Sequence, residues 1–245
     1  MSAAQNIYDN PVFFDGYRKL RENPDSANIL LEKPALFELS PDLTGKIVLD
    51  LGCGYGKNCA EFYRRGAKSV VGVDISEKML EVAKSENHGI RFERLDMNDL
   101  SALKGKFDVI FSSLAAHYIE DFDKFAEAVS GSLNSGGYFI FSQEHPLTTA
   151  PVKGASWAKD ADGNADHYIL TDYGNTGERN TSWIVDSVIK YHRTFSEILN
   201  ALINAGLAIE KLIEPIPSRE IISRLPGYAK DLHKPSFLLA RARKY

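Results

Sequence analysis

Three glycines at alternate positions follow a short apolar run, and this turn constrains the fold more than any other feature of the chain. Residues 47–51 (Ile-Val-Leu-Asp-Leu) are almost continuously apolar, which predicts a strand buried on both faces. Gly52, Gly54 and Gly56 come next, and a helix is predicted from about residue 56 to residue 65. Glycine lets the backbone adopt positive φ and approach a ligand closely. A strand, such a turn and a helix in this order predict a site for a nucleotide-like ligand.

The region after this turn alternates between short apolar runs and amphipathic helices. Helices are predicted after Ser76, which can cap one, and over residues 122–133, where apolar residues recur at helical spacing. This alternation is typical of right-handed crossovers onto a mostly parallel sheet with helices on both faces. The sequence therefore predicts an α/β protein with a doubly wound sheet. The strands of its core are expected at residues 47–51, 70–74, 90–95, 107–112 and 138–142.

The segments around this core are expected to complete a single domain of residues 1–245. Residues 1–44 are expected to form an N-terminal helical cap, in which Asn10 caps a helix starting at Pro11 and Pro34 kinks a second helix. Residues 45–143 are expected to form the ligand-binding core.

The rest of the chain is expected to form an insertion and a closing unit. Residues 146–190 contain both tryptophans, and two extended runs, at 167–173 and 181–192, flank a turn-rich stretch that predicts a β-hairpin. Residues 194–245 then close the fold. Thr194 and Glu197 predict a capping box for a helix, and strands are expected at 207–213 and 237–240.

Composition narrows the classes of function. The chain has 33 acidic and 29 basic side chains among 245 residues, and its net charge of −4 gives no bulk attraction to nucleic acid or to an anionic membrane. No uncharged apolar run reaches the ~18 residues that a membrane span needs, and no signal-peptide pattern is present. We therefore expect a cytoplasmic protein. Cys53 and Cys59 lack the paired spacing of a zinc site and are expected to be reduced and packed.

Two acidic residues stand where a ligand of the glycine-rich turn would lie. Dinucleotide sites have the pattern Gly-x-Gly-x-x-Gly, which would need glycine where Lys57 stands, so the match to a nicotinamide or flavin site is poor. Asp74 ends the second predicted strand, where its carboxylate can accept hydrogen bonds from ribose hydroxyls. Asp96 follows the third strand at the same edge of the sheet. A nucleotide-cofactor oxidoreductase and a non-catalytic binding module are the alternatives to consider.

Taken in order, these motifs resemble those of the class I S-adenosylmethionine-dependent methyltransferases. The resemblance covers residues 45–143 most strongly and implies a seven-stranded sheet whose last strand is antiparallel. The matching motifs are 48–56 (Val-Leu-Asp-Leu-Gly-Cys-Gly-Tyr-Gly), 72–76 (Gly-Val-Asp-Ile-Ser), 95–98 (Leu-Asp-Met-Asn), 107–113 (Phe-Asp-Val-Ile-Phe-Ser-Ser) and 133–137 (Leu-Asn-Ser-Gly-Gly).

The resemblance also implies S-adenosylmethionine as the cofactor and assigns residues to its parts. Asp50 would face the methionine ammonium, directly or through water, and Asp74 would bind the ribose. The glycines would pass under the methionine and ribose, and Asp96 would accept a hydrogen bond from the exocyclic amine of the adenine. The whole implied cofactor-binding set is Asp50, Gly52, Cys53, Gly54, Gly56, Asp74, Ile75, Met79, Asp96, Met97, Asn98 and Ser113.

The candidates for proton transfer are His117 and Tyr118, which follow the fourth strand, and Glu144 and His145, which follow the fifth. A methyltransferase chiefly holds the acceptor in line with the methyl group, so a base is optional. His117 and His145 are the predicted catalytic residues, although His117 is at least as well explained by a structural role, and His192 is a weaker candidate. No metal is expected, because the acidic loop that contains Asp160, Asp162, Asp166 and His167 lacks the spacing of a metal site.

The expected partner is a small-molecule acceptor. Residues 112–115 (Ser-Ser-Leu-Ala) stand where methyltransferases of DNA and of glutamine amides have an Asn-Pro-Pro-Tyr-like motif, and the chain shows no basic face, so no nucleic acid is expected. The N-terminal cap and the 146–190 insertion have apolar stripes and are expected to form a lid over the acceptor pocket. Packing in the core or in a homodimer is the alternative explanation of these stripes.

Overall fold

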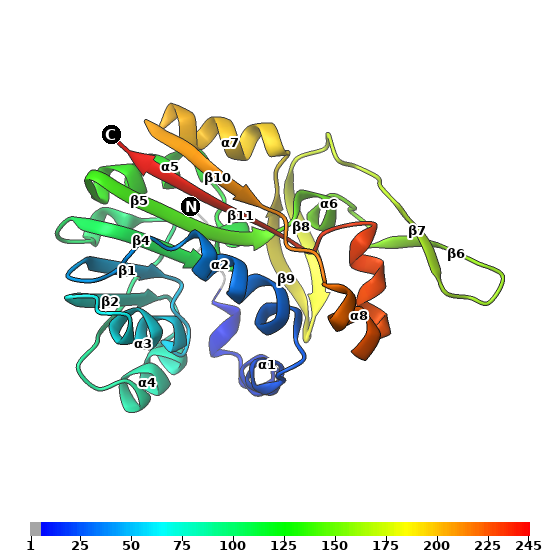
Figure 1. Cartoon of the computed structure of the whole chain (residues 1–245), viewed down its shortest axis with the longest axis horizontal. Coiled ribbons are helices and arrows are strands. Elements are labelled where there is room, and N and C mark those ends of the chain that lie inside the picture. Colours follow the sequence, from blue (N-terminus) through cyan, green and yellow to red (C-terminus); the bar gives the residue numbers. More distant parts are fainter. Residues whose placement is uncertain (1–5) are drawn as a thin grey trace.

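The computed structural model describes residues 6–245, which form a seven-stranded sheet with helices on both faces (Figure 1). The strand order is β10-β11-β5-β4-β1-β2-β3, and β11 alone runs antiparallel to its neighbours in this sheet. The predicted fold class is confirmed. The strands are β1 (Ile47–Leu51), β2 (Ser69–Asp74), β3 (Arg91–Arg94), β4 (Phe107–Ser113), β5 (Leu133–Glu144), β10 (Leu207–Ile213) and β11 (Phe237–Lys244).

Each face of the sheet has its own apolar core. One core joins α2 (Lys33–Leu39), α3 (Lys57–Arg64) and α4 (Glu77–Glu86) to the sheet, with Phe62 stacked on Phe111 at 4.1 Å between ring centroids. The other joins α5 (Phe122–Ser132) and α7 (Phe195–Asn204) to the opposite face (Figure 1). Because strands buried on both faces have no polar side, β1 and β4 are mostly apolar and lack a regular alternation of apolar and polar residues.

Helix caps form where the sequence predicts them. The Asn10 side chain accepts from the backbone of Val12 and Phe13 at the start of α1 (Pro11–Glu22), and Thr194 and Glu197 form the capping box of α7. The second N-terminal helix is not broken at Pro34, but it is irregular just before it: a π-helical turn, η2 (Asn28–Glu32), runs directly into α2. A wider turn relieves the clash between the proline ring and the preceding carbonyl groups.

The insertion contains two hairpins, so the prediction of one hairpin across the 174–177 turn is wrong. β6 (Ser156–Lys159) pairs with β7 (Ala165–Ile169), and β8 (Gly177–Trp183) pairs with β9 (Val185–His192). The predicted run 181–192 folds back on itself at Ile184, which has a φ of +60°. The β6–β7 hairpin projects away from the sheet, whereas β8–β9 lies beside α1 at the carboxyl ends of the strands (Figure 1).

Three helical elements near the carboxyl ends of the strands were not predicted. They are α6 (Pro146–Thr149), α8 (Arg219–Arg224) and the 3₁₀ segment η5 (Pro226–Leu232), and each is short, with no amphipathic period to mark it. In residues 6–245 we find no helix with the length and apolar character needed to cross a bilayer. The first five residues of the expected N-terminal cap lie outside the described residues.

Candidate functional site

The glycine-rich turn is held open by its backbone conformation. Gly52, Gly54 and Gly56 have φ of +73°, +53° and +73°, values that strongly favour glycine. The backbone N–H groups of Gly52 and Cys53 both donate to the Val73 carbonyl at 2.9 Å, which ties the turn to β2. The turn is therefore fixed in place.

Neighbouring side chains also require glycine at two of these positions. A β-carbon on Gly52 would stand 2.6 Å from Cβ of Ala115, and one on Gly56 would stand 2.7 Å from the ring of Phe92. At Gly54, by contrast, nothing lies within 4 Å of the place a β-carbon would take. The backbone of Gly54 thus borders open space at the carboxyl edge of the sheet.

Asp74 connects the glycine turn to the start of α4. Its Oδ2 accepts from the Gly54 N–H at 2.8 Å and its Oδ1 accepts from the Ser76 N–H at 2.9 Å. Burial raises the pKa of Asp74, while these backbone hydrogen bonds oppose the shift. Since a carboxylate can accept about four hydrogen bonds, capacity remains for hydroxyl donors.

Asp50 is a buried carboxylate with an unused oxygen. It is 1% exposed; its Oδ2 accepts from the Cys59 thiol at 3.3 Å, and its Oδ1 has no hydrogen-bond partner among the described residues. Burial raises the pKa of Asp50 to about 7. An unpartnered buried carboxylate is costly unless a ligand supplies a cation or a donor.

The residues that follow β3 also lie at the carboxyl edge of the sheet. Asp96 accepts from the backbone and side-chain amide of Asn98 at 2.9 and 3.1 Å, so this acid and amide are held together. The sulfur of Met97 would stand 3.4 Å from a β-carbon on Gly52, which places this side chain against the glycine turn. Met79, at the start of α4, is fully buried.

Glu32 is a third buried carboxylate at this edge, after Asp50 and Asp74, and it lies in no sequence motif. It is 1% exposed and lies in the π-helical turn η2. Its Oε1 accepts from the hydroxyls of Ser113 and Ser142 at 2.8 and 2.5 Å, and its Oε2 accepts from the Asn28 amide at 2.6 Å. The one sequence signal is a charged residue that directly follows the apolar run 29–31. Burial raises the pKa of Glu32.

The start of the described chain crosses the same strand ends. Asp9, in the 3₁₀ turn η1 (Ile7–Asp9), accepts from the Ser76 hydroxyl at 2.6 Å and from the Lys78 N–H at 3.2 Å. Beside it, the Tyr8 hydroxyl donates to that of Tyr118 at 3.3 Å. The backbone carbonyl of Ile75 accepts a hydrogen bond from the side-chain amide of Asn6 at 3.5 Å. These contacts place the N-terminal cap over the carboxyl ends of β2 and β4.

Comparison with known proteins assigns this arrangement. Residues 49–141 match the methyltransferase domain family. A Haemophilus influenzae protein described as uncharacterized is 41% identical, over 98% of this chain and 97% of its own length. The crystal structure of an S-adenosylmethionine dependent methyltransferase from Mesorhizobium loti has a TM-score of 0.81 at 40% identity, and a related structure from Listeria monocytogenes has 0.78 at 36%. The two cover 89% and 87% of this chain, and 98% of each of those chains.

This chain is a class I S-adenosylmethionine-dependent methyltransferase. The residues present fit that cofactor, which carries a sulfonium and an ammonium group. Asp50 offers an unused buried oxygen, Asp74 offers acceptors, and open space borders Gly54. A pyrophosphate-bearing cofactor would meet these carboxylates with like charge. The oxidoreductase alternative is therefore set aside.

The two predicted catalytic histidines of the methyltransferase differ in their surroundings. His117 is buried, its Nδ1 accepts from the Glu144 N–H at 3.4 Å, and burial lowers its pKa to about 4. His145 has both ring nitrogens engaged: Nδ1 accepts from the Leu147 N–H at 3.1 Å, capping α6, and Nε2 lies 2.7 Å from Glu214. His192 is engaged as well, by Thr149 and by a backbone carbonyl.

A buried ion pair that sequence reasoning missed lies beside His117. Nζ of Lys190, on β9, is 2.5 Å from Oε1 of Glu144 at the end of β5, and it also lies 5.1 Å from the ring centroid of Trp183. The two charged residues are 46 positions apart in the chain, so no local pattern could have paired them.

Aromatic contacts join the N-terminal cap to the β8–β9 hairpin. Trp183 meets Phe13 and Tyr17 of α1 at 5.4 and 6.0 Å between ring centroids. Trp157, on the other hairpin, packs instead on Tyr168 at 5.1 Å and contacts His233. Among residues 6–245, the aromatic contacts between the two segments predicted to form a lid run through β8–β9, and β6–β7 takes no part in them.

The acidic loop around Asp160 is organised by its own backbone. Asp160 accepts from the N–H groups of Asp162 and Asn164 at 3.0 and 2.8 Å, and His167 pairs with the adjacent Asp166. Among residues 6–245, no group of three or more His, Cys, Asp or Glu side chains is arranged to hold a metal ion.

Proposed function

We propose that this methyltransferase acts on a small-molecule acceptor, which binds over the carboxyl ends of β4 and β5 beneath α1 and the β8–β9 hairpin. The contact of Trp183 with Phe13 and Tyr17 carries this proposal, because it joins α1 to the β8–β9 hairpin, and we infer that the two together enclose that edge of the sheet. An enclosed site favours a small acceptor over a nucleic acid, and the net charge of −4 agrees. Enclosure also keeps water away from the methyl group.

The cofactor would lie between the glycine turn and the N-terminal cap. We assign its ribose to Asp74 and its methionine part to Asp50, with Gly54 beneath. Its adenine would lie near Asp96. The other residues assigned to cofactor binding are Gly52, Cys53, Gly56, Ile75, Met79, Met97, Asn98 and Ser113. Support comes from the positive φ of the glycines, the open space at Gly54 and the unused oxygen of Asp50.

The bound cofactor supplies an electrophilic methyl group and a neutral thioether leaving group, so the chain chiefly orients the acceptor. His117 is the proposed proton acceptor of the two histidines, because only its Nδ1 is engaged by another described residue, whereas both ring nitrogens of His145 are engaged. We assign His145 a positioning role, because both of its nitrogens hold the turn after β5 and the start of α6.

The test is a transfer assay with methyl-labelled S-adenosylmethionine. A panel of small metabolites, DNA, RNA and a cell-protein extract would be offered separately to the full chain, with Asp74→Ala as the inactive control. We expect label in at least one small metabolite and none in the polymers. Label in a polymer alone would overturn the small-molecule proposal.

A further inference from the structure

Glu32 is held at the carboxyl edge of the sheet by the N-terminal cap, outside every methyltransferase motif. Its three hydrogen-bond donors, on Asn28, Ser113 and Ser142, are all neutral. They fix the direction of the carboxylate without compensating its charge. The wider π-helical turn that carries Glu32 is a feature often found at functional sites.

Asp50 belongs to the same buried acidic group. Burial is the main cause of the raised pKa of Asp50, and the charges of Asp74 and then Glu32 add to it, so Glu32 and Asp50 influence each other electrostatically. Both are 1% exposed, and neither forms an ion pair with another described residue. Two buried carboxylates without a cation are unfavourable in the protein alone. A cationic group of a ligand, placed near both, would relieve this cost.

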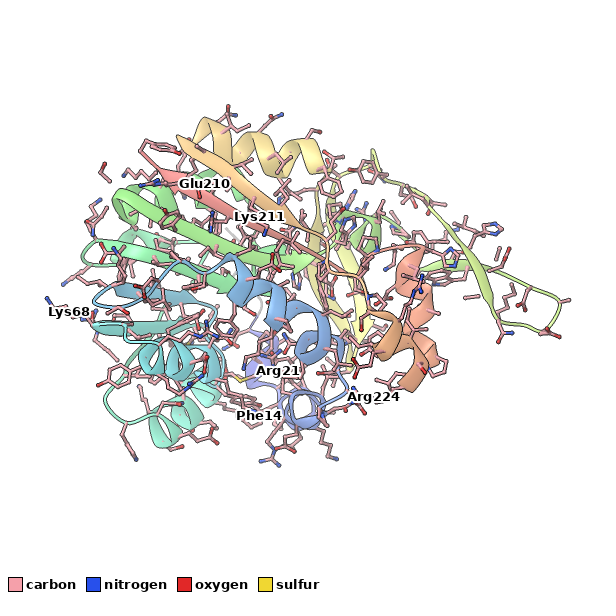
Figure 2. The ribbon with its side chains drawn as sticks, viewed as in Figure 1. Phe14, Arg21, Lys68, Glu210, Lys211 and Arg224 are labelled. Atoms are coloured by element: carbon pink, nitrogen blue, oxygen red, sulfur yellow. The ribbon has the colours of Figure 1, made fainter. Side chains whose placement is uncertain are left out.

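Arg21 of α1 is the basic residue that acts on both carboxylates. Burial raises the pKa of Glu32 and of Asp50, and the charge of Arg21 opposes part of each rise; its guanidinium lies 5.7 Å from the ring centroid of Tyr17. Figure 2 shows Arg21 on the N-terminal cap, near α2. Two acids and one arginine are complementary to an α-amino acid group, which carries one ammonium and one carboxylate.

We propose that Glu32 and Asp50 together bind the α-ammonium group of the cofactor's methionine part, and that Arg21 faces its α-carboxylate. The N-terminal cap then recognises the amino-acid end of the cofactor, while the glycine turn and Asp74 recognise the nucleoside end. This inference rests on the proposed placement of the cofactor at Gly54 and Asp74.

Calorimetric titration with three probes tests the assignment. S-adenosylmethionine and S-adenosylhomocysteine both carry the α-amino acid group, whereas 5′-methylthioadenosine lacks it. Glu32→Gln is expected to weaken binding of the first two by about tenfold or more, the size expected for a lost charge-assisted hydrogen bond, and to leave methylthioadenosine unchanged. Arg21→Gln is expected to give the same pattern and does not disturb a buried group.

Glu38→Gln is the matched control, because Glu38 is an exposed acid on the adjoining α2 that pairs with Lys211 at 2.6 Å. It should leave all three affinities unchanged. Thermal unfolding supplies a second readout: replacing an uncompensated buried acid by its amide should not lower the Tm of the ligand-free protein. A purely structural role for Glu32 would lower that Tm and weaken all three ligands.

Three results would overturn the proposal. The first is that Glu32→Gln weakens the affinity for methylthioadenosine as much as the affinities for the other two ligands. The second is that only the affinity for S-adenosylmethionine falls, which would place Glu32 at the sulfonium. The third is that all affinities stay unchanged in both Glu32→Gln and Arg21→Gln. Asp74→Ala separates this inference from the proposed cofactor placement. If Asp74→Ala weakens all three ligands and the two cap variants weaken none, only the present inference fails. If Asp74→Ala has no effect on any ligand, the placement itself fails.

Discussion

Gly54 combines a positive φ with open space on the side where a β-carbon would stand. Gly54→Val would strain the backbone and place the new side chain in the proposed cofactor space. We expect binding of S-adenosylhomocysteine to fall below detection by calorimetry. Gly206→Val is the control, because Gly206 also has a positive φ and open surroundings but lies after α7. It should lose about 1–2 kcal/mol of stability and keep its affinity. Equal affinity in the two variants would place the ligand elsewhere.

The ionisation of Asp50 predicts a pH dependence of stability. Its folded-state pKa is raised to about 7, chiefly by burial and in part by the charges of Asp74 and Glu32, while the hydrogen bond from Cys59 and the charge of Arg21 oppose the rise. The native state therefore holds a proton that the unfolded chain has already released above about pH 4. The stabilising contribution of that proton is complete below about pH 4 and is lost as pH rises through 7.

This effect is measured by urea unfolding of the ligand-free wild type and of the Asp50→Asn variant. The unfolding is repeated at half-unit steps from pH 5 to pH 8. The free energy of unfolding of the wild type should fall relative to the variant by up to ~1.4 kcal/mol per pH unit. Parallel curves for the two proteins would show that Asp50 keeps an ordinary pKa.

At the level of elements, each hairpin of the insertion contains one tryptophan, and we expect replacing the two tryptophans to have different effects on activity. Trp183→Ala removes the contacts of β8 with Phe13 and Tyr17 of α1, so we expect turnover to fall by at least tenfold while affinity for S-adenosylhomocysteine changes by less than about threefold. Trp157→Ala changes the hairpin that takes no part in those contacts and should keep both values. The measurement is steady-state kinetics with the acceptor found by the transfer assay. Full activity of Trp183→Ala would exclude the proposed lid.

Elements with a local signal could be predicted from the sequence, and those without one could not. The strand β10 follows from its apolar run, and the capping box of α7 follows from Thr194 and Glu197. The β8–β9 turn could not be predicted, because Ile184 has positive φ although nothing in Trp-Ile-Val marks a turn. Its conformation accompanies a close contact with Gly16, where an added β-carbon would stand 2.6 Å from Ile184. Tertiary packing decides the conformation there.

On the scale of the whole molecule, one part of the candidate site could be predicted from the sequence and another part could not. Its nucleoside side lies in motifs within residues 48–98 and could be located from the sequence, because strand ends of a parallel sheet meet at one edge. The residues that the N-terminal cap contributes to the site could not be located from the sequence. Glu32 meets Ser142 across 110 residues and Asp9 meets Ser76 across 67, and only the folded chain brings these pairs together. The acceptor side depends on the same long-range contacts, so its residues were the least accessible to prediction.

Because cap and core both contribute to the proposed site, ligand binding should stabilise the molecule as one unit. S-adenosylhomocysteine at about 100 times its dissociation constant should add about 2.7 kcal/mol, which for a chain of this size corresponds to a rise in Tm of about 5–10 °C. Hydrogen exchange should slow in both β1–β2 and the 28–39 region of the cap, while β6–β7, which projects from the body, should not change. NAD at the same concentration is the control and should leave the Tm unchanged. A rise with NAD would contradict a site specific for the S-adenosyl cofactor. Protection confined to the core would show that the cap is not part of the cofactor site.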